Sequence, residues 1–576
     1  MSAAVRGRSQ GRRLDQPLVA VLEKRGRFLV AEPLFGRGPR TAVERGGASE
    51  GDLVLVGSGK RGARVVRRIG RPDVARDVLE GLMLDRGLHR SYGRAATAEA
   101  GGAVDDPYAA DARVDLTELP TFTIDPDDAK DFDDAISARR EDGYIRLWIH
   151  IADVTAYLRP GGPLEREASR RGTSVYVPGA VEPMLPEALS NRACSLRPGE
   201  ERLAVTVELE LHRTEARNVS FHRSRVRSDR RLTYREVDGI FAGRSRAEEP
   251  WAAPLEAARE AARALRERRD AVEIGSPEPS FEFDGEGYVS GVRYDEQTES
   301  HQLIEQLMIL ANEQVAGYLA DRKLPTLYRV HERPEPQAVA FLVEQLASLD
   351  VPTPPVPRNM TQQQAADLAA GLSRVVAREA GDRPALGVLV LRSLKQAFYS
   401  PRNLGHAGLG SPRYCHFTSP IRRYPDVVAH RALLQGLGID HTAAPGHELD
   451  EAGMLSSASE REAVQIERAA DDVCMAFLLA RRLADADPAS PPAFAGEVVG
   501  LIEKGVFVRF GDEGFEGFLP SRRMRDWWTL NELGTALVAE ASGRHLRLGD
   551  PMDVVVDQVE PARGRVDLSP AGAYSE

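Results

Sequence analysis

The hydrophobic and polar positions along the chain form two kinds of pattern. Residues 18–69 contain short apolar runs rich in Val, Leu and Ala, which alternate with polar turn signals that contain Gly. Several short strands at such regular spacing predict a small antiparallel barrel. Residues from 493 onward show the same pattern, which predicts a second small barrel at the C-terminal end.

The long central region, residues 113–486, mixes strand and helix patterns. Residues 144–151 and 203–211 are rich in β-branched and other apolar side chains, as strands are. Residues 299–320 and 459–483 instead carry apolar side chains at helical spacing. Because the strands and helices do not alternate regularly, as they would in a parallel α/β sheet, the pattern predicts an α+β fold.

The segments outside these regions are predicted to be less regular. Residues 73–87 have a helical pattern, and residues 96–112 form a linker rich in Gly, Ala and Asp. Residues 1–16 are polar and Arg-rich and lack the apolar core of a secretion signal, which indicates a disordered basic tail. The predicted order is a basic tail at 1–16, a barrel at 17–72, a helical segment and linker at 73–112, a central domain at 113–486 and a barrel at 493–570.

The composition is that of an ordinary soluble globular chain, with 42% hydrophobic and 28% charged residues. No run of about 18 apolar residues is present, so no membrane span is predicted. The three cysteines, Cys194, Cys415 and Cys474, lie far apart and form no C-x-x-C pair. They are predicted to be free thiols in a reducing cytoplasm, which excludes a disulfide framework and a zinc site built from cysteines.

Residues 125–134 hold six carboxylates within ten positions, flanked by the apolar residues Ile124 and Ile136. Like charges near a core repel one another and lose hydration, at a cost of several kcal/mol each, unless a cation neutralises them. The segment therefore predicts a divalent-metal site. An EF-hand loop starting at Asp125 is excluded, because it needs Gly at the sixth position and Glu at the twelfth, where Lys130 and Ile136 stand. An acidic surface loop is the alternative interpretation.

The charge of the chain is unevenly distributed. The formal net charge of -11 argues weakly against a nucleic-acid ligand. Residues 1–75, however, contain 16 Lys and Arg against 7 Asp and Glu. A basic front end on an acidic body suits a protein that guides a polyanion toward a metal-loaded site, although residues 1–16 alone would equally serve as a solubilising tail.

The C-terminal strands carry aromatic and basic residues that suit RNA. Residues 496–510 combine a strand with a Gly-aromatic-Val step, and Leu-Gly-Asp follows at 548–550, an order that resembles the OB barrel first described in ribosomal protein S1. The resemblance implies RNA binding, with bases stacked on Phe507 and Phe518. Of the four local phenylalanines, two, Phe510 among them, are expected to fill the core. The cationic candidates for phosphate contacts are Lys504, Arg509, Arg522, Arg523 and Arg525.

Two further segments are too specific for simple core packing. Residues 172–179 read Gly-Thr-Ser-Val-Tyr-Val-Pro-Gly, and residues 416–427 read His-Phe-Thr-Ser-Pro-Ile-Arg-Arg-Tyr-Pro-Asp-Val. Together with the aspartate segment, they resemble the RNase II/RNase R family of 3′→5′ exoribonucleases over residues 123–483. The resemblance implies an RNB catalytic domain flanked by a cold-shock-like OB barrel and an S1-like OB barrel.

The resemblance also implies a role for each residue at a matching position. The metal ligands are Asp125, Asp131, Asp133 and Asp134, whose spacing matches the family's four carboxylates, and the catalytic residues are Asp133 and Arg422, the latter at the scissile phosphate. The RNA-binding residues of the central domain are Tyr176, which stacks on the 3′-terminal nucleotide, Glu467 near the 3′ end, and Arg423. Glu467 would equally fit an exposed helix glutamate paired with a neighbouring arginine.

The activity implied by the resemblance is hydrolytic release of 5′-mononucleotides from the 3′ end of single-stranded RNA, in RNA turnover or processing. Two Mg²⁺ ions, or Mn²⁺ in their place, would activate a water and stabilise the leaving 3′ oxygen. The expected partners are single-stranded RNA with a free 3′ end and RNA-decay or ribosome-associated proteins, with no membrane. The protein is expected to be a cytoplasmic monomer.

The Ser-Pro-Ile-Arg-Arg-Tyr-Pro-Asp sequence leans toward the RNase R branch, but the shortened front end leaves the RNase II and RNase R branches both open. Two departures from the family pattern argue against strong activity on double-stranded RNA and predict an altered channel wall. Ala407 stands where the family usually has Phe, and one N-terminal barrel is present where long members have two. Two other functions compete with the exoribonuclease. A catalytically silent RNA-binding protein of the same fold would be expected to lose one of the four aspartates. A phosphodiesterase for DNA or small nucleotides would have no use for RNA-type barrels at both ends.

Overall fold

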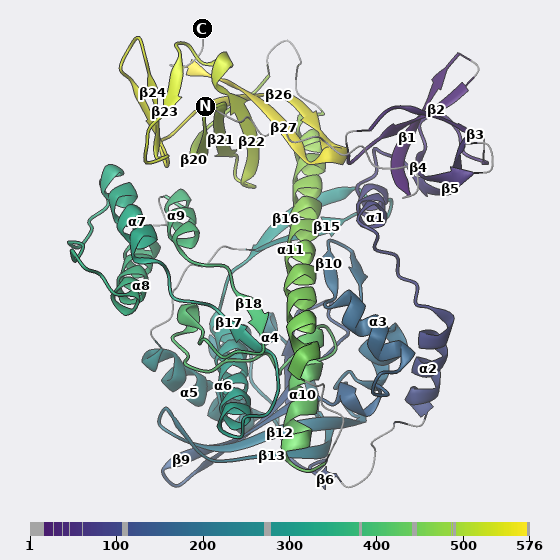
Figure 1. Ribbon diagram of the computed structural model, residues 1–576, viewed down its shortest axis with the longest axis vertical. Coiled ribbons are helices and arrows are strands. Elements are labelled where there is room, and N and C mark those ends of the chain that lie inside the picture. Colours follow the sequence, from purple (N-terminus) through teal and green to yellow (C-terminus); the bar gives the residue numbers. More distant parts are fainter. Residues whose placement is uncertain are drawn as a thin grey trace.

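The computed structural model describes residues 17–572 except 27, 37, 45, 60–61, 106, 108–112, 270–277, 380–382, 440–445, 485–486 and 488–490. The predicted basic tail at 1–16 lies outside the described residues. A central domain of sheet and helices carries a small β domain toward each end of the chain, so the predicted α+β fold is confirmed (Figure 1). No helix among the described residues combines the length and apolar character needed to cross a bilayer.

The N-terminal strands form the closed barrel that their spacing predicts. They are β1 (Leu18–Arg25), β2 (Phe28–Pro33), β3 (Thr41–Glu44), β4 (Leu53–Gly59) and β5 (Gly62–Gly70). β1 pairs with β2 on one side and with β4 on the other, which closes the sheet in the order β1-β2-β3-β5-β4. Leu22, Ala31 and Val54 lie in its apolar interior.

Residues 94–105, most of which were expected to belong to a linker, form helix α2 (Arg94–Asp105) instead. Ala is the best helix former, and Ala96, Ala100 and Ala103 are buried on one face of this helix. Such small side chains bury little apolar area, so the helix leaves only a weak periodic signal in the sequence. Helix α1 (Ala75–Asp85) lies within the predicted helical stretch.

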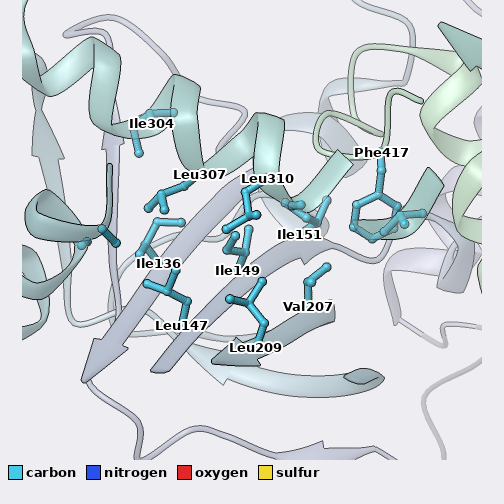
Figure 2. Packing of buried hydrophobic residues seen from close by; sticks show 14 of the residues in the cluster. Ile136, Leu147, Ile149, Ile151, Val207, Leu209, Ile304, Leu307, Leu310 and Phe417 are labelled. Carbon is cyan, nitrogen blue, oxygen red and sulfur yellow. The ribbon is translucent and has the colours of Figure 1, made fainter. Parts of the chain in front are cut away.

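A seven-stranded sheet forms the centre of the molecule, in the order β14-β7-β8-β9-β12-β13-β6. Its strands are β6 (Val114–Asp115), β7 (Phe122–Asp125), β8 (Asp134–Glu141), β9 (Tyr144–Ala152), β12 (Glu201–His212), β13 (Glu215–Arg227) and β14 (Arg230–Thr233). Helix α6 (Glu299–Asp321) packs on one face, where its Leu307 joins Ile136 and Ile149 in a continuous apolar cluster (Figure 2). This core holds the ends of β7 and β8, and with them the aspartate segment, in place.

The longest helix, α11 (Gly446–Leu483), joins the central domain to both terminal domains. It has 38 residues and is therefore about 57 Å long. Its C-terminal half packs in one apolar cluster with α1, the N-terminal barrel and the C-terminal domain (Figure 1). Only residues 459–483 were expected to be helical, because Gly453 lowers helix propensity in the first turns. A Cβ at Gly453 would lie 2.9 Å from the carbonyl oxygen of Tyr399, so this close approach requires glycine.

The remaining elements of the central domain are shorter. They are α3 (Pro163–Arg171), β10 (Val175–Val177), β11 (Ala180–Glu182), α4 (Tyr234–Phe241), α5 (Ala252–Arg268), β15 (Glu278–Phe283), β16 (Val289–Asp295), β17 (Tyr328–Val330), α7 (Pro336–Ser348), α8 (Gln362–Glu379), α9 (Ala385–Ser393), β18 (Phe398–Ser400) and α10 (Tyr424–Gly436). The β10–β11 hairpin carries Tyr176, and α10 begins directly after Arg422 and Arg423.

The C-terminal domain contains a six-stranded sheet in the order β19-β26-β27-β22-β21-β20. Its strands are β19 (Ala493–Phe494), β20 (Gly496–Ile502), β21 (Gly505–Phe510), β22 (Phe515–Pro520), β26 (Val554–Glu560) and β27 (Arg565–Pro570). Between β22 and β26, where the sequence pattern left a gap, three further strands form a separate sheet. They are β23 (Trp528–Leu530), β24 (Ala536–Ala539) and β25 (His545–Arg547).

Candidate active site

The aspartate segment links two neighbouring strands of the central sheet. Strand β7 ends at Asp125 and strand β8 begins at Asp134. Phe132, in the loop between them, is buried, and its amide donates a hydrogen bond to Oγ of Ser195 (3.1 Å). The Ser195 hydroxyl in turn donates to the carbonyl oxygen of Lys130 (2.8 Å). These contacts tie the loop to the core, which argues against a solvated surface loop.

Asp133 is the most enclosed of the four predicted metal ligands, with 5% of its surface exposed. Its Oδ1 accepts a 2.8 Å hydrogen bond from the amide of Ile421. Its Oδ2 lies 3.6 Å from Nε of Arg422. Burial raises the pKa of Asp133 well above its usual range, although the positive charge of Arg422 opposes the shift. A carboxylate in this position is costly to ionise unless further positive charge arrives.

Asp125 and Asp134 lie close enough for the charge of one to act on the other. Burial and then the neighbouring charge of Asp134 raise the pKa of Asp125 to about 7. Burial raises the pKa of Asp134 to about 6, against the opposing charges of Arg422 and Arg423. Oδ2 of Asp125 is buried and has no hydrogen-bond partner. The pKa of both carboxyls is raised, so the nearby arginines do not offset the burial of these two groups, and one oxygen of Asp125 lacks a donor.

Tyr176 connects the aspartates to helix α11. Its hydroxyl donates a 2.8 Å hydrogen bond to Oδ2 of Asp131, and its amide donates a 3.0 Å hydrogen bond to Oε1 of Glu467. Glu467 is partly buried, and this burial raises its pKa. The interpretation of Glu467 as an exposed helix glutamate is therefore wrong. The structure places Glu467 in direct contact with the Tyr176 backbone, which the sequence alone had no means of showing.

The two adjacent arginines have different surroundings. Arg422 is 48% exposed and faces Asp133, so its guanidinium borders both the aspartates and solvent. Arg423 instead donates two hydrogen bonds to the carboxylate of Asp426, from Nε (2.9 Å) and Nη2 (2.8 Å), and Asp426 is completely buried. The guanidinium of Arg423 is therefore already bound by a carboxylate of the protein. Its predicted RNA-binding role stays a prediction.

The loop that carries Arg422 is fixed by residues that the sequence did not single out. The amide of Ser419 donates a 2.7 Å hydrogen bond to Oδ1 of Asp426, at the start of α10. The amide of Ser174, beside Tyr176, donates a 2.9 Å hydrogen bond to the carbonyl oxygen of Arg422. Asp426 lies in the Tyr-Pro-Asp sequence after the arginines. Because proline is common in the first turn of a helix, this sequence could have predicted a helix start with Asp426 in its first turn.

The donor set of this site is made of carboxylate oxygens, which are ligands for divalent cations. Among the residues that the structure describes, no three His, Cys, Asp or Glu side chains form an arrangement ready to hold a metal ion. The chemistry of the donors nevertheless fits one. Asp125 has an unpartnered buried oxygen, and burial raises the pKa of Asp125, Asp133 and Asp134. A hard cation that prefers oxygen ligands would bind the unpartnered oxygen of Asp125. Its positive charge would also lower the pKa of the three carboxyls.

The predicted stacking residues of the C-terminal domain lie in a different part of the molecule. Phe510 and Phe515 are buried, which confirms that two of the four phenylalanines fill the core. Phe507, 40% exposed, lies opposite Phe518 across β21 and β22, with ring centroids 5.1 Å apart. Figure 1 shows these strands well separated from β10 and the central sheet. Their RNA-binding role stays a prediction.

Comparison with protein families identifies two domains. Residues 113–438 match the model of the RNB domain, and residues 492–570 match the model of the S1 RNA binding domain. The chain is 36% identical to Ribonuclease R of Escherichia coli over 482 residues, which is 79% of this chain and 57% of that protein. The chain therefore spans little more than half the length of this relative.

Solved structures with the same fold include proteins of different activity. RNase R of Mycoplasma genitalium, solved in complex with ribose methylated single-stranded RNA, superposes with a TM-score of 0.82 at 22% identity and covers 96% of this chain and 89% of its own. Yeast Ssd1, described as a pseudonuclease, superposes with a TM-score of 0.67 at 16% identity and covers 91% of this chain and 67% of its own. At these identities the likeness shows the fold alone.

Proposed function

Because this chain belongs to the RNB-domain family, with an S1 RNA binding domain at its C-terminal end, we propose that it is a 3′→5′ hydrolytic exoribonuclease. Its substrate is single-stranded RNA with a free 3′ end, and its products are 5′-mononucleotides. The buried, unpaired cysteines Cys194, Cys415 and Cys474 fit a reducing cytoplasm, and we propose that the protein acts there as a monomer in RNA turnover.

One observation carries the proposal: Asp133, Arg422 and Tyr176, far apart in the chain, belong to one connected network. The fold does not decide between an active and a silent protein, because a pseudonuclease shares it. The network does favour activity. Asp125, Asp131, Asp133 and Asp134 are all retained, and burial raises the pKa of Asp125, Asp133 and Asp134, a cost without purpose in a protein that only binds RNA.

The proposal includes divalent cations held by these four aspartates. Mg²⁺, with Mn²⁺ as an alternative, suits an all-oxygen donor set. When bound, two such ions supply the positive charge that lowers the pKa of an attacking water and stabilises the leaving 3′ oxygen of a phosphodiester. The aspartates themselves must be deprotonated to bind them, which couples cation binding to pH.

Arg422 is placed to neutralise the substrate. Its guanidinium is half exposed, while its Nε faces Oδ2 of Asp133 at 3.6 Å. The two terminal amino groups of this planar fork are suited to the non-bridging oxygens of the scissile phosphate, where negative charge grows during displacement. Asp133 orients the fork from behind, and the Ser174 amide fixes the backbone that carries it.

In this proposal, Tyr176 and Glu467 receive the 3′-terminal nucleotide. The aromatic ring of Tyr176 offers a face for the last base, while its hydroxyl and amide hold it between Asp131 and Glu467. A carboxylate beside the terminal ribose accepts hydrogen bonds from its hydroxyl groups. The 2′-hydroxyl is the group that distinguishes RNA from DNA, so Glu467 is the proposed contributor to RNA selectivity.

The experiment that tests this function uses the purified full chain with Mg²⁺ and one single-stranded RNA in two forms, labelled at its 5′ end to follow shortening and labelled at its internal phosphates to follow released nucleotides. Progressive shortening from the 3′ end, with release of 5′-mononucleotides seen by thin-layer chromatography, is the expected result. Bound but intact RNA would identify a silent RNA-binding protein. Equal hydrolysis of a DNA strand of the same length would instead favour the phosphodiesterase alternative.

A further inference from the structure

The inserted three-stranded sheet of the C-terminal domain has two unlike faces. Trp528, Leu537 and Leu546 are buried and join the core of the domain. The opposite face, which carries Thr529, Val538 and His545 in one cross-strand row, is partly or fully exposed. The inner face therefore explains how the sheet is held, whereas the outer face is presented to solvent.

Trp527 stands at the edge of this outer face and is 71% exposed. All four tryptophans of the chain lie in its described part, and the other three, Trp148, Trp251 and Trp528, are buried. Exposing an indole leaves a large apolar surface in water, and the neighbouring Trp528 shows that the adjacent position can be buried. The exposure of Trp527 therefore needs a reason outside the folding of the domain.

The turn that presents Trp527 is built with backbone strain. Asp526 has a φ of +88°, a conformation that residues other than glycine rarely adopt. Its carboxylate accepts hydrogen bonds from the amides of Trp527 (2.7 Å), Ala541 (3.1 Å) and Ser542 (2.9 Å). The Glu540 amide also donates to the carbonyl oxygen of Trp527 (2.8 Å). The indole is thus displayed from a fixed turn, and such strain is typical of functional positions.

The surroundings of this turn carry both signs of charge, because the exposed Glu540 lies opposite Trp527 and two exposed arginines precede it. Arg522 and Arg525, on the segment that leads from β22 to Trp527, are exposed. The nearby Arg523 and Arg509 are instead engaged by the carboxylates of Asp557 and Glu516. Hydrogen bonds from the Ser542 hydroxyl and from backbone amides lower the pKa of Asp526 to about 2, so this carboxylate is negatively charged at neutral pH. Two exposed cations therefore flank an exposed aromatic ring.

We propose that Trp527, with Arg522 and Arg525, forms an RNA-stacking anchor on the inserted sheet, separate from the active site. An unstacked base lies on the indole, and the two guanidinium groups contact the adjoining phosphates. This combination of ring and cations is what sequence-independent binding of single strands requires. The proposal rests on the proposed RNA substrate. It adds a contact far from the 3′ end, since Figure 1 shows β23 and β24 well separated from β10.

Charge favours RNA over a protein as the occupant. A tryptophan beside arginines is also typical of protein interfaces. The body of this chain outside residues 1–75 is acidic, however. Two exposed arginines on one short segment give it a local positive charge, to which phosphate groups bind. The S1 RNA binding domain model also spans residues 492–570 and thus includes this turn.

The first test uses the fluorescence of Trp527 in an Asp133→Asn background, which keeps the RNA intact. Because the other three tryptophans are buried, quenching by acrylamide reports mainly on Trp527. Addition of a single-stranded RNA of about 20 nucleotides is expected to change the emission and to protect it from acrylamide. The same RNA is expected to cause no such change in Trp527→Phe.

The second test measures RNA affinity by anisotropy in the same background. Trp527→Ala is expected to weaken binding of the long RNA about ten-fold, the loss of one base–aromatic stack. Trp527→Phe retains a ring and is expected to restore most of the affinity. Phe341→Ala is the matched control, because Phe341 is an exposed aromatic on α7 in another domain. It is expected to leave the affinity unchanged.

Two results would overturn the anchor. One is an emission and quenching profile that RNA leaves unchanged. The other is self-association, seen by analytical ultracentrifugation and abolished by Trp527→Ala with RNA affinity unaffected, which would assign the indole to a protein contact. Both readouts measure binding, so a wild-type chain that fails to hydrolyse RNA would refute the exoribonuclease proposal without deciding this one.

Discussion

The hydroxyl of Tyr176 donates a 2.8 Å hydrogen bond to Oδ2 of Asp131, so the residue expected to stack on RNA also holds a predicted metal ligand. The two residues are separated by 45 positions in sequence. The contact gives one side chain two separable tasks. Its ring is the proposed stacking face for a base, and its hydroxyl orients a carboxylate, as partners of metal ligands commonly do.

Replacing Tyr176 by Phe separates these tasks. The ring is retained, so the length of the final undigested RNA is expected to stay unchanged. The lost hydrogen bond to Asp131 is expected to raise the Mg²⁺ concentration for half-maximal activity roughly ten-fold, the usual scale for such partners. Titration of activity with Mg²⁺ and a product ladder on one RNA measure both effects.

Tyr176→Ala is the companion variant. It removes the ring as well as the hydroxyl, so a longer final remnant is expected in addition to the shifted Mg²⁺ dependence. An identical remnant for wild type, Phe and Ala variants would remove Tyr176 from the substrate site.

Asp133→Asn is expected to lower turnover by roughly 10³-fold or more while RNA binding stays close to that of the wild type. The amide oxygen still accepts the hydrogen bond from the Ile421 amide, but the charge that a cation requires is gone. Single-turnover hydrolysis and anisotropy binding measure the two properties.

The same substitution has a consequence for stability. Burial raises the pKa of Asp133, so ionising it in the folded protein is unfavourable when no cation is present. In EDTA at neutral pH, Asp133→Asn is therefore expected to melt at the same or a higher temperature than the wild type. A clearly lower melting temperature would show that Asp133 stabilises the fold without metal.

Much of the fold was predictable because its signals are local. Most strands of the N-terminal barrel and of the C-terminal six-stranded sheet, and β9 and β12 of the central sheet, follow from short apolar runs between turn signals. Helix α2 was missed, since its alanines bury little area, and β23 to β25 were missed, since their strands are three or four residues long. Such short strands are stabilised by packing on the domain rather than by their own pattern.

The candidate site was predictable in membership but not in arrangement. The motifs supplied the aspartates, Tyr176 and Arg422, and the family resemblance gave Arg422 and Arg423 different roles without a physical reason for the difference. The difference arises from Asp426, which is buried at the start of α10 and binds Arg423. The contact between Glu467 and the Tyr176 amide joins positions 291 residues apart, and one sequence carries no signal of such a pair.

The raised pKa values of Asp125 and Asp134 predict how stability depends on pH without metal. These carboxyls have pKa values of about 7 and about 6 in the folded protein, against about 3.9 when unfolded. Between these pKa values the folded state binds more protons than the unfolded state. The stability that the two protonated carboxyls contribute is therefore fully present below about pH 4 and is lost as the pH rises toward 7. Melting temperatures in EDTA from pH 4.5 to 7.5 are expected to show this fall, beyond the slope of the remaining groups.

Two comparisons isolate the contribution of the site. Asp125→Asn removes one titrating group and is expected to flatten the decline. Saturating Mg²⁺ is expected to raise the melting temperature more at pH 7.5 than at pH 5, because cation binding requires deprotonated ligands. A stabilisation by Mg²⁺ that is equal at both values would contradict a site made of these carboxylates.

Arg422→Ala and Arg423→Ala are expected to damage the protein in different ways. Arg422 is half exposed and faces Asp133, so its loss is expected to reduce turnover about 10²-fold or more with little change in stability. Arg423 neutralises the fully buried Asp426, and removing one partner of such a pair typically costs about 3–5 kcal/mol. Chemical denaturation and single-turnover rates measured on both variants make the comparison.

Arg422→Lys keeps the charge but loses the planar fork, so an activity close to that of Arg422→Ala would assign the effect to geometry. Recovery to the wild-type rate would instead show that charge alone is required. Equal destabilisation by both alanine variants would mean that Arg422, like Arg423, serves the fold rather than the phosphate.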